Sequence, residues 1–472
     1  ATDPTLGPTV DAFQFVEDVP ACGWDDTRVL DAEIGSYVVT ARRKGDEWYV
    51  GAMTDESGRA LDVPLDFLDA APGEREGHEK GKGEGHEKGK GEGHTKGKYV
   101  AELYSDGIDA AYDANLSDVR VAEVVVDADT ALLASMVRTG GTAVRIRPAT
   151  GREVVDLPEY ERPTQDVDVA IAAETFVQEP FVEATGSNDG DFVGGTTVEL
   201  LVDGDVATTD NVRFPPNSTD ATDALSYAID EPGTYDVTVR TTDGTTLAAE
   251  TVTVKPPETV VNLSDPAGDD HGPGSYTYPT NGAFEAGAFD VRSFTVEQTP
   301  SVYEFTVEVE NLYDAWGSGR GFSPHMFVLW VRDPAKSGGS TASLDDLEAT
   351  VSFEQPWHYR LEVSGYTKSA VDATGAPLTD ADGDAVSLRE NVDTTANTVT
   401  LSVDRAAFDG LDAADLAVVP AVQSEDRGTL RPVAEQRDAY VFGGAKDGAS
   451  GVAPRIADLV APDGVAQSDA LA

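Results

Sequence analysis

Alternation of apolar and polar residues with a period of two marks much of the chain, and it is clearest in the last third. Phe294 and Val296 lie on one side of one predicted strand, and Phe305, Val307 and Val309 lie on one side of the next. The run from Met326 to Val331 is apolar without alternation, which indicates a strand buried on both faces. These patterns predict a β-sandwich in this part of the chain.

The first third of the chain shows the same pattern. Alternating runs from Tyr37 to Ala41 and from Trp48 to Ala52 are joined by the turn Lys44-Gly45-Asp46 and predict a hairpin. Further strands are predicted at Leu61 to Leu65, Tyr99 to Tyr104, Arg120 to Val126 and Ala143 to Arg147. A short amphipathic piece from Val10 to Asp18 is the predicted helix, and it stops before Pro20.

The middle of the chain carries about six short predicted strands with turn residues between them. Residues 149–165 contain proline and many charges, so we expect a linker there. We therefore predict an all-β chain of three successive β-sandwich modules with flexible joints and a short N-terminal helical remnant. The expected boundaries are 1–23, 24–148, 149–165, 166–257 and 258–472.

The net charge of the chain limits the kinds of partner that it can bind. The 472 residues include 86 Asp plus Glu against 34 Lys plus Arg, for a formal charge of −52. Such a chain repels nucleic acid and anionic membranes, which makes both improbable partners. Abundant acidic residues on well-patterned strands are typical of a halophilic protein, because in molar salt the Debye length falls to about 3 Å.

Cys22 is the single cysteine, which excludes an intrachain disulfide. No run of 18 apolar residues predicts a transmembrane helix. The sequence begins with Ala1 and shows no signal peptide, so we expect a processed or truncated product.

Residues 74–98 consist of an eight-residue repeat, GHEKGKGE, with His78, His86 and His94. Its glycine content predicts disorder, because little apolar surface is available to offset the ordering cost. Weak metal binding through the histidines is one hypothesis, and a tolerated repeat expansion in a surface loop is the preferred one.

Candidate chemistry is concentrated in the loop before the last predicted sandwich. Asp265, Asp269 and Asp270 lie among glycines and prolines, which exclude helix and regular strand. Calcium takes 6–8 oxygens, and a glycine-rich loop can bend carboxylates around it. The alternative is a solvated acidic turn.

Aromatic residues near this loop are candidate sugar contacts, because pyranose faces stack on exposed rings while hydroxyls seek polar partners. We predict carbohydrate contact at Trp316 and Trp357, with Tyr276 and Tyr278 as further platforms, and buried packing is the alternative for each. Trp330 lies in the apolar run and is expected in the core. No motif for a catalytic nucleophile, a zinc-dependent protease or a phosphate-binding loop occurs.

Residues 258–472 resemble the C-terminal module of glucodextranase, a DOMON-like β-sandwich also appended to amylopullulanases. The resemblance lies in Asp265-Pro266, Gly268-Asp269-Asp270, Gly272-Pro273-Gly274, Tyr278-Pro279 and Trp316-Gly317, and in the ending APRIADLVAPDGVAQSDALA. It implies carbohydrate or surface binding, and it favours a structural calcium ion.

Residues 10–148 resemble the C-terminal end of glycoside hydrolase family 97, which includes α-glucosidases and α-galactosidases. The resemblance lies in Trp24-Asp25-Asp26-Thr27, Ala41-Arg42-Arg43, Trp48-Tyr49-Val50-Gly51-Ala52 and Leu65-Asp66-Phe67-Leu68. The family's catalytic (β/α)8 barrel precedes this domain. The piece from Val10 to Pro20 resembles the last helix of that barrel, so residues 1–23 are expected to be a remnant of its end, and we carry over no catalytic residue. Residues 166–257 are similar to CARDB-type immunoglobulin-like modules, through Glu179-Pro180-Phe181 and Pro232-Gly233-Thr234-Tyr235.

Together these features predict the non-catalytic accessory end of an exported α-glucan-processing hydrolase, located outside the cell or at its surface. An α-glucosidase, as the first domain alone would suggest, is one alternative. A structural component of a surface layer is the other. α-Glucan and the cell surface are the expected partners.

Overall fold

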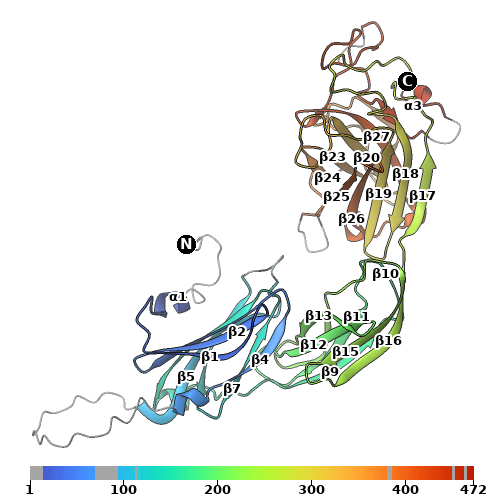
Figure 1. Ribbon diagram of the computed structural model, residues 1–472. Helices are drawn as coiled ribbons and strands as arrows, with labels where there is room; N and C mark the ends of the chain where they lie inside the picture. The colour runs from blue at the N-terminus through green and yellow to red at the C-terminus, as the bar shows by residue number, and fades with distance from the viewer. Residues whose placement is uncertain are drawn as a thin grey trace, which may run out of the picture. The chain divides into compact units, whose positions relative to one another are not determined.

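The computed structural model describes residues 14–69, 94–111, 115, 117–379, 385–448, 452–461 and 465–471. It confirms the all-β class, with strands gathered into sandwiches (Figure 1). The chain divides into two compact units, residues 1–255 and 256–472, and the first unit contains two sandwiches. Among the described residues no helix is long and apolar enough to cross a bilayer.

The first sandwich pairs a sheet of six strands, in the order β1-β2-β3-β8-β5-β6, with the two-stranded sheet β4-β7. Its strands are β1 Asp26–Glu33, β2 Tyr37–Lys44, β3 Glu47–Thr54, β4 Arg59–Pro64, β5 His94–Asp106, β6 Val119–Val126, β7 Ala131–Met136 and β8 Gly141–Thr150. The predicted hairpin is confirmed as β2 and β3, which turn at Gly45 with φ of 61°. A helix α1, Gln14–Asp18, precedes the sheet, and η2, Asp66–Asp69, follows β4.

The repeat of residues 74–98 lies mostly outside the described residues, and its expected disorder and metal binding stay predictions. Its last residues are a different case, because β5 begins at His94 and pairs there with Thr150 of β8.

The segment 149–165, predicted as a linker, follows the surface of the first sandwich. It contains α2, Glu153–Asp156, and its carbonyl at Pro158 accepts a hydrogen bond from the Val125 amide at 2.8 Å. The hydroxyl of Tyr160 accepts a further bond, from the Leu133 amide at 2.9 Å. These bonds hold residues 158–160 against the first sandwich.

The second sandwich packs the sheet β10-β16-β15-β12-β13 on the sheet β14-β11-β9, as in immunoglobulin-like folds. Its strands are β9 Gln165–Ile171, β10 Glu174–Phe176, β11 Val182–Asn188, β12 Thr196–Val202, β13 Asp205–Val212, β14 Ser218–Ala224, β15 Gly233–Thr241 and β16 Thr246–Lys255.

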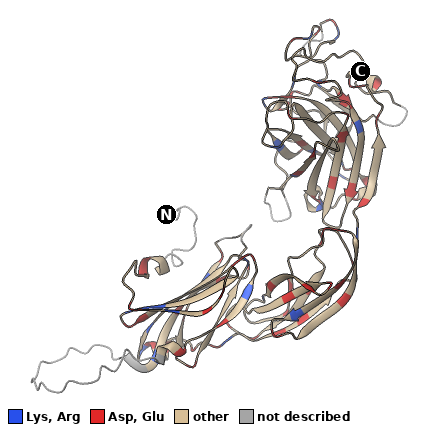
Figure 2. Ribbon diagram, in the orientation of Figure 1, with Lys and Arg blue, Asp and Glu red and all other residues tan. Residues whose placement is uncertain are grey.

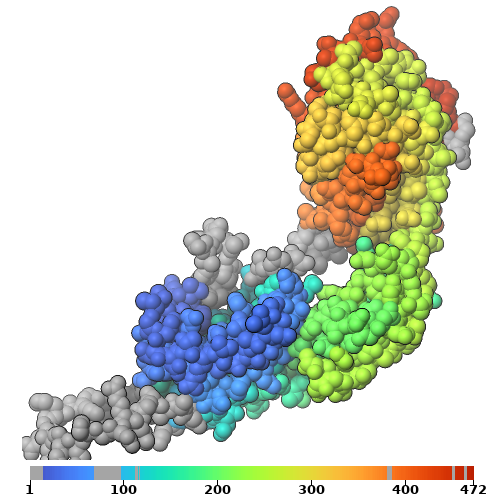
Figure 3. All heavy atoms as spheres, in the orientation of Figure 1, coloured from blue at the N-terminus to red at the C-terminus, as the bar shows by residue number. Residues whose placement is uncertain are grey.

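The two sandwiches of the first unit share a polar interface, where their atoms are in contact (Figure 3). Thr197 in β12 receives a hydrogen bond from the Ala60 amide at 2.9 Å and donates one to the Ala60 carbonyl at 3.1 Å. Asn211 in β13 is 5% exposed, and its amide nitrogen donates to Ser135 and to the carbonyl of Met136. Buried groups paired in this way hold one relative position, because separating them would leave them without partners.

The second unit is a larger sandwich of the sheet β17-β18-β19-β26-β25 and the sheet β24-β23-β20-β27-β28, to which β29 adds on β27. The strands of the first sheet are β17 Glu258–Ser264, β18 Val291–Gln298, β19 Val302–Val309, β25 Arg389–Asp393 and β26 Thr398–Asp404. Those of the second are β20 His325–Arg332, β23 Tyr359–Ser364, β24 Lys368–Asp372, β27 Ala417–Asp426, β28 Thr429–Leu430 and β29 Asp458–Leu459.

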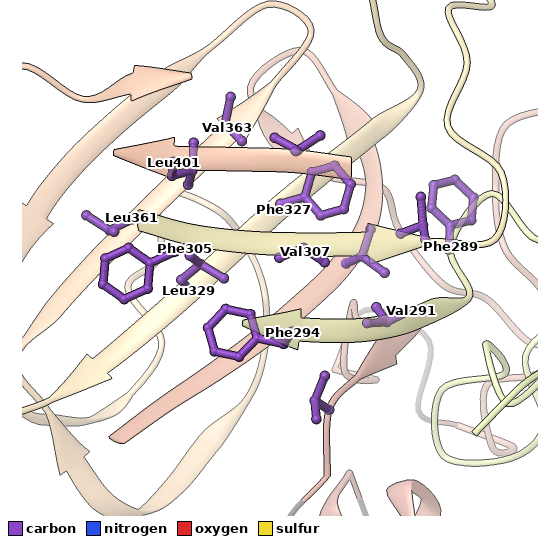
Figure 4. Close-up of a cluster of buried hydrophobic side chains, with 14 of the residues drawn as sticks. Phe289, Val291, Phe294, Phe305, Val307, Phe327, Leu329, Leu361, Val363 and Leu401 are labelled. Atoms are coloured by element: carbon purple, nitrogen blue, oxygen red, sulfur yellow. The ribbon is translucent and has the colours of Figure 1, made fainter. Parts of the chain in front are cut away.

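The core of this unit lies between the two sheets and is rich in phenylalanine (Figure 4). Phe294 of β18 and Phe305 of β19 face Phe327 and Leu329 of β20, as the alternation predicts. The other face of β20 is buried as well, because Met326, Val328 and Trp330 belong to a second apolar cluster. The prediction that this strand is buried on both faces is therefore confirmed.

That second cluster is covered by a hairpin and by the C-terminal segment. The hairpin consists of β21, Ser340–Ala342, and β22, Ser352–Trp357, and the C-terminal segment ends in α3, Gln467–Ala470. The 3-10 turns η3, Arg405–Phe408, and η4, Ala413–Asp415, connect β26 to β27. The C-terminal segment thereby returns to the loop that opens the unit.

Candidate functional site

Three carboxylates from the two ends of the second unit converge at one point. Asp265 follows β17, Asp269 lies in the next turn, and Asp458 begins β29. One oxygen of each lies within 4.8 Å of the others, an arrangement able to hold a metal ion. Asp265 and Asp269 are thus brought together as the sequence predicts, and Asp458, which sequence reasoning missed, completes the group.

The backbone around the cluster explains how these side chains are held. The amide of Asp265 donates to the Arg292 carbonyl at 3.0 Å, and the amide of Gly272 donates to the Ala457 carbonyl at 2.7 Å. The side-chain nitrogen of Gln467, in α3, donates to the Asp269 carbonyl at 2.6 Å. The loop, β29 and α3 are therefore linked directly to each other.

Asp458 is fully buried, and each of its oxygens accepts one backbone amide hydrogen bond. The donors are Val291 at 2.7 Å and Leu459 at 2.9 Å. One oxygen each of Asp265 and Asp269 is buried as well, and neither has a hydrogen-bond partner among the described residues. A buried carboxylate oxygen without a donor is costly, so the cluster favours a proton or a cation there.

The electrostatics of the cluster point the same way. Burial, followed by repulsion from Asp269 and Asp290, raises the pKa of Asp265 to about 7. Burial, followed by repulsion from Asp265 and Asp269, raises the pKa of Asp458 to about 9. Burial also raises the pKa of Asp269. Three carboxylates that resist ionising together retain protons at neutral pH, and a cation bound there would have to displace those protons.

Asp270, predicted as a ligand, has a different position. Its carboxylate accepts a hydrogen bond from the hydroxyl of Tyr278, and that hydroxyl accepts one from the Phe289 amide at 3.0 Å. Asp270 is 6% exposed and does not join the three converging carboxylates. Asp270 therefore serves as a hydrogen-bond acceptor for Tyr278 and lies outside the group of three carboxylates.

The two tyrosines predicted as sugar platforms are packed inside the module. Tyr276 is 2% exposed and its hydroxyl donates to the Pro454 carbonyl at 2.8 Å. The Tyr278 ring meets Phe289 and Phe442 edge to face, and its pKa is raised by burial and by Asp270. Tyr276 is thus buried and lines the cavity described next, whereas Tyr278 is half-buried and packs against the core, as in the packing alternative.

Trp357 is also buried, contrary to the prediction of an exposed ring. It is 2% exposed and its indole nitrogen donates to the Ala342 carbonyl at 3.1 Å. Trp330, expected in the core, is 2% exposed and lies in the same apolar cluster. Both line a cavity of about 980 Å³ whose wall is mostly aliphatic, with Val261, Val418 and Val419 among its residues.

Trp316 is the predicted platform that keeps an accessible surface. Its ring is partly buried and meets Phe284 edge to face, with 5.8 Å between centroids. Its loop is held by Asp314, which accepts from the amides of Trp316 at 3.3 Å and Ser318 at 2.8 Å. A partly exposed indole on a fixed loop suits stacking against a pyranose face.

Two segments of the chain, one near each end, match known protein families. Residues 260–472 match the family described as the C-terminal binding module, SLH-like, of glucodextranase. Residues 23–77 match the family described as glycosyl hydrolase 97 C-terminal, oligomerisation. The resemblances stated from the sequence are thus confirmed for these two segments.

Individual proteins match shorter parts of the chain. A retaining alpha-galactosidase of Bacteroides thetaiotaomicron is 52% identical over 54 residues, which cover 11% of this chain and 8% of that protein. A glycoside hydrolase family 97 enzyme from Pseudoalteromonas sp. strain K8, solved with acarbose, is 32% identical, with a TM-score of 0.23, over 29% of this chain and 18% of that chain. The CARDB domain of a Pyrococcus furiosus protein, solved with di-metal ions, is 17% identical, with a TM-score of 0.15, over 20% of this chain and 90% of that domain. The chain therefore spans less than a fifth of the length of its hydrolase relatives.

Proposed function

We propose that this chain, which joins a family 97 C-terminal domain to a glucodextranase-type binding module, is a non-catalytic accessory region of an exported protein that processes α-glycosides. The second unit binds α-glucan or a related polysaccharide at the cell surface. A calcium ion held by Asp265, Asp269 and Asp458 stabilises that unit. The observation that carries the proposal is the convergence of these three carboxylates in a binding module.

Calcium suits the donors of this cluster. All three side chains offer carboxylate oxygens, which hard divalent cations prefer, and no nitrogen or sulfur ligand belongs to the group. The ion would replace the protons that the raised pKa values favour, and it would relieve the mutual repulsion of the carboxylates. Because the ligands come from the loop and from β29, its expected role is to hold these segments together.

The first prediction concerns calcium and stability. Calcium at a hundredfold excess over Kd should increase the free energy of unfolding of the second unit by about 2.7 kcal/mol. The melting temperature of that unit should rise accordingly. Asp458→Asn should abolish this rise, because it removes a ligand charge. Asp469→Asn is the matched control, since Asp469 is an exposed acid in nearby α3. Calorimetry with calcium and with chelator measures the effect, and an equal rise in both variants would contradict the site.

The second prediction concerns pH. Without metal, the pKa values of Asp265 and Asp458 in the folded protein lie above the ordinary carboxyl pKa of about 4. Both groups therefore bind protons more tightly in the folded state than in the unfolded state. Their contribution to stability is therefore complete below about pH 4 and is lost as the pH rises through about 7 and 9. Calcium competes with those protons, so its stabilising effect should be larger at pH 8 than at pH 5. Melting curves at both pH values check this, and a calcium effect that grows toward acid pH would contradict it.

The third prediction is that this chain alone does not hydrolyse glycosides. Among the described residues, helices are confined to a few short turns, whereas a catalytic (β/α)8 barrel needs about 250 residues of alternating strand and helix. Incubation with chromogenic α-glucosides and α-galactosides in molar salt should show no turnover. Turnover that a point mutation in this chain abolishes would refute the proposal.

The test of binding is retention on insoluble polysaccharide. The chain should be depleted from solution by starch or dextran in a calcium-containing buffer of high salt, and Trp316→Ala should weaken that depletion. Isolated cell envelope is the second matrix, because an SLH-like binding module suggests association with the cell surface. A chain that none of these matrices retains would refute the proposed function.

A further inference from the structure

A second ring and a buried cation accompany Trp316. Tyr440 is 49% exposed, and the centroid of its ring lies 6.2 Å from that of Phe284, which is only 8% exposed. Phe284 therefore meets both Trp316 and Tyr440, edge to face in each case. Trp316 and Tyr440 are thus two accessible rings on a common buried support.

Arg431 connects the three rings. Its guanidinium carbon lies 5.8 Å from the Trp316 centroid, 5.3 Å from that of Phe284 and 5.7 Å from that of Tyr440. Arg431 is 5% exposed, and its nitrogens donate to the Ser424 hydroxyl and to the carbonyls of Glu425 and Tyr440. A desolvated cation over aromatic faces attracts each ring, so Arg431 holds both accessible rings in place.

The loop that carries Tyr440 is fixed by independent bonds. The amides of Thr280 and Asn281 donate to the carbonyls of Asp438 at 2.9 Å and Ala439 at 3.1 Å. The side-chain nitrogen of Asn281 donates to the Tyr440 hydroxyl at 2.8 Å. The ring is therefore ordered before any ligand arrives, which lowers the entropy cost of binding.

We propose that Trp316 and Tyr440 form one carbohydrate platform, in which each ring stacks on a different pyranose unit of a single α-glucan chain, with Arg431 as the positioning residue. This inference rests on the proposed polysaccharide binding and deepens it. A ligand that spans two rings must contain several linked sugars, so affinity should rise steeply from glucose to maltohexaose. Asn281 and the Tyr440 hydroxyl supply polar atoms beside the rings for the sugar hydroxyls.

The experiment uses the full chain with soluble amylose and dextran in affinity electrophoresis, and with maltohexaose in calorimetry. Tyr440→Ala should weaken binding about tenfold, and Tyr440→Phe should weaken it less, because it keeps the stacking ring and loses only the hydroxyl and its bond to Asn281. Tyr366→Ala is the matched control, since Tyr366 is 46% exposed on the same unit and has no ring contact with the platform. Arg431→Lys should weaken binding less than Tyr440→Ala, because the charge remains while the bonds to the loop are lost.

The outcomes separate this inference from the proposed function. If the unchanged chain binds glucan and Tyr440→Ala binds equally well, the platform is refuted while polysaccharide binding stands. If Tyr366→Ala weakens binding as much as Tyr440→Ala, the platform is refuted in favour of a different surface. If the unchanged chain binds none of the three probes, the α-glucan ligand itself is refuted.

Discussion

Replacing Trp357 by alanine should lower the free energy of unfolding of the second unit by about 3–5 kcal/mol, the cost of removing a large buried side chain. The ring is 2% exposed in the cluster on the outer face of β20, and its nitrogen bonds the β21 carbonyl of Ala342. The substitution therefore removes the apolar contacts of the ring and its hydrogen bond to Ala342, a residue that is exposed and whose carbonyl keeps the Ser340 hydroxyl as a donor. Denaturant unfolding at fixed salt and calcium measures the loss.

Trp316→Ala is the control for this prediction. Its ring is partly exposed, so we expect a smaller loss, of about 1 kcal/mol, together with weaker glucan retention. Trp357→Ala should show the opposite pattern, with reduced stability and unchanged binding by the protein that remains folded. If Trp357→Ala reduced binding at full stability, the ring would be a ligand platform.

Removing salt should destabilise the protein by several kcal/mol, on the order of 10 °C in melting temperature for modules of this size. The formal charge is −52, and Asp and Glu lie along the strands of all three sandwiches while Lys and Arg are few (Figure 2). At low salt these charges repel each other over distances that molar salt screens. Melting curves from low to multimolar potassium chloride test this expectation.

Sucrose at matched osmolality is the control, because it is excluded from protein surfaces without screening charge. The rise in melting temperature should be much larger in salt than in sucrose. A melting temperature that stays level across the salt series would show that the acidic surface does not limit stability.

The sequence predicted those elements whose pattern is local. Alternation identified β18 and β19, and the unbroken apolar run identified β20 as doubly buried. Strand β1 was missed, because its residues are mostly exposed or half-buried and show little apolar alternation. The docking of the first two sandwiches was missed as well, because a buried polar residue such as Asn211 looks like any surface residue in the sequence.

The candidate cation site was predictable only in part, because one of its three carboxylates comes from a distant part of the chain. Asp265 and Asp269 lie in one glycine-rich loop, so their proximity follows from the sequence. Asp458 lies at the far end of the module, and only the pairing of β29 with β27 brings it to that loop. Its segment resembles the end of the glucodextranase module, a signal that would have justified asking what Asp458, the first of the three acids in that segment, does.

Local sequence misled us about the aromatic residues. Trp357 lies between Pro356 and His358, a context that suggests an exposed turn, yet β22 folds it onto the sheet. Tyr440 gave no sequence signal, because its partners Phe284 and Arg431 are distant along the chain. The exposure of an aromatic ring depends on which segments of the chain pack over it. The spacing of residues near the ring in the sequence does not predict those segments.

A cation bound where Asp265 and Asp458 converge would give the module a reversible cross-link. A cation held there would join the two ends of the module as a disulfide would, and a disulfide closing so long a loop is worth about 5 kcal/mol in the chain-entropy model. The chain has a single cysteine, so it cannot form a covalent equivalent. Unlike a disulfide, such a cross-link forms without an oxidant and opens when calcium is scarce, so calcium outside the cell would determine when the C-terminal segment becomes open to proteases.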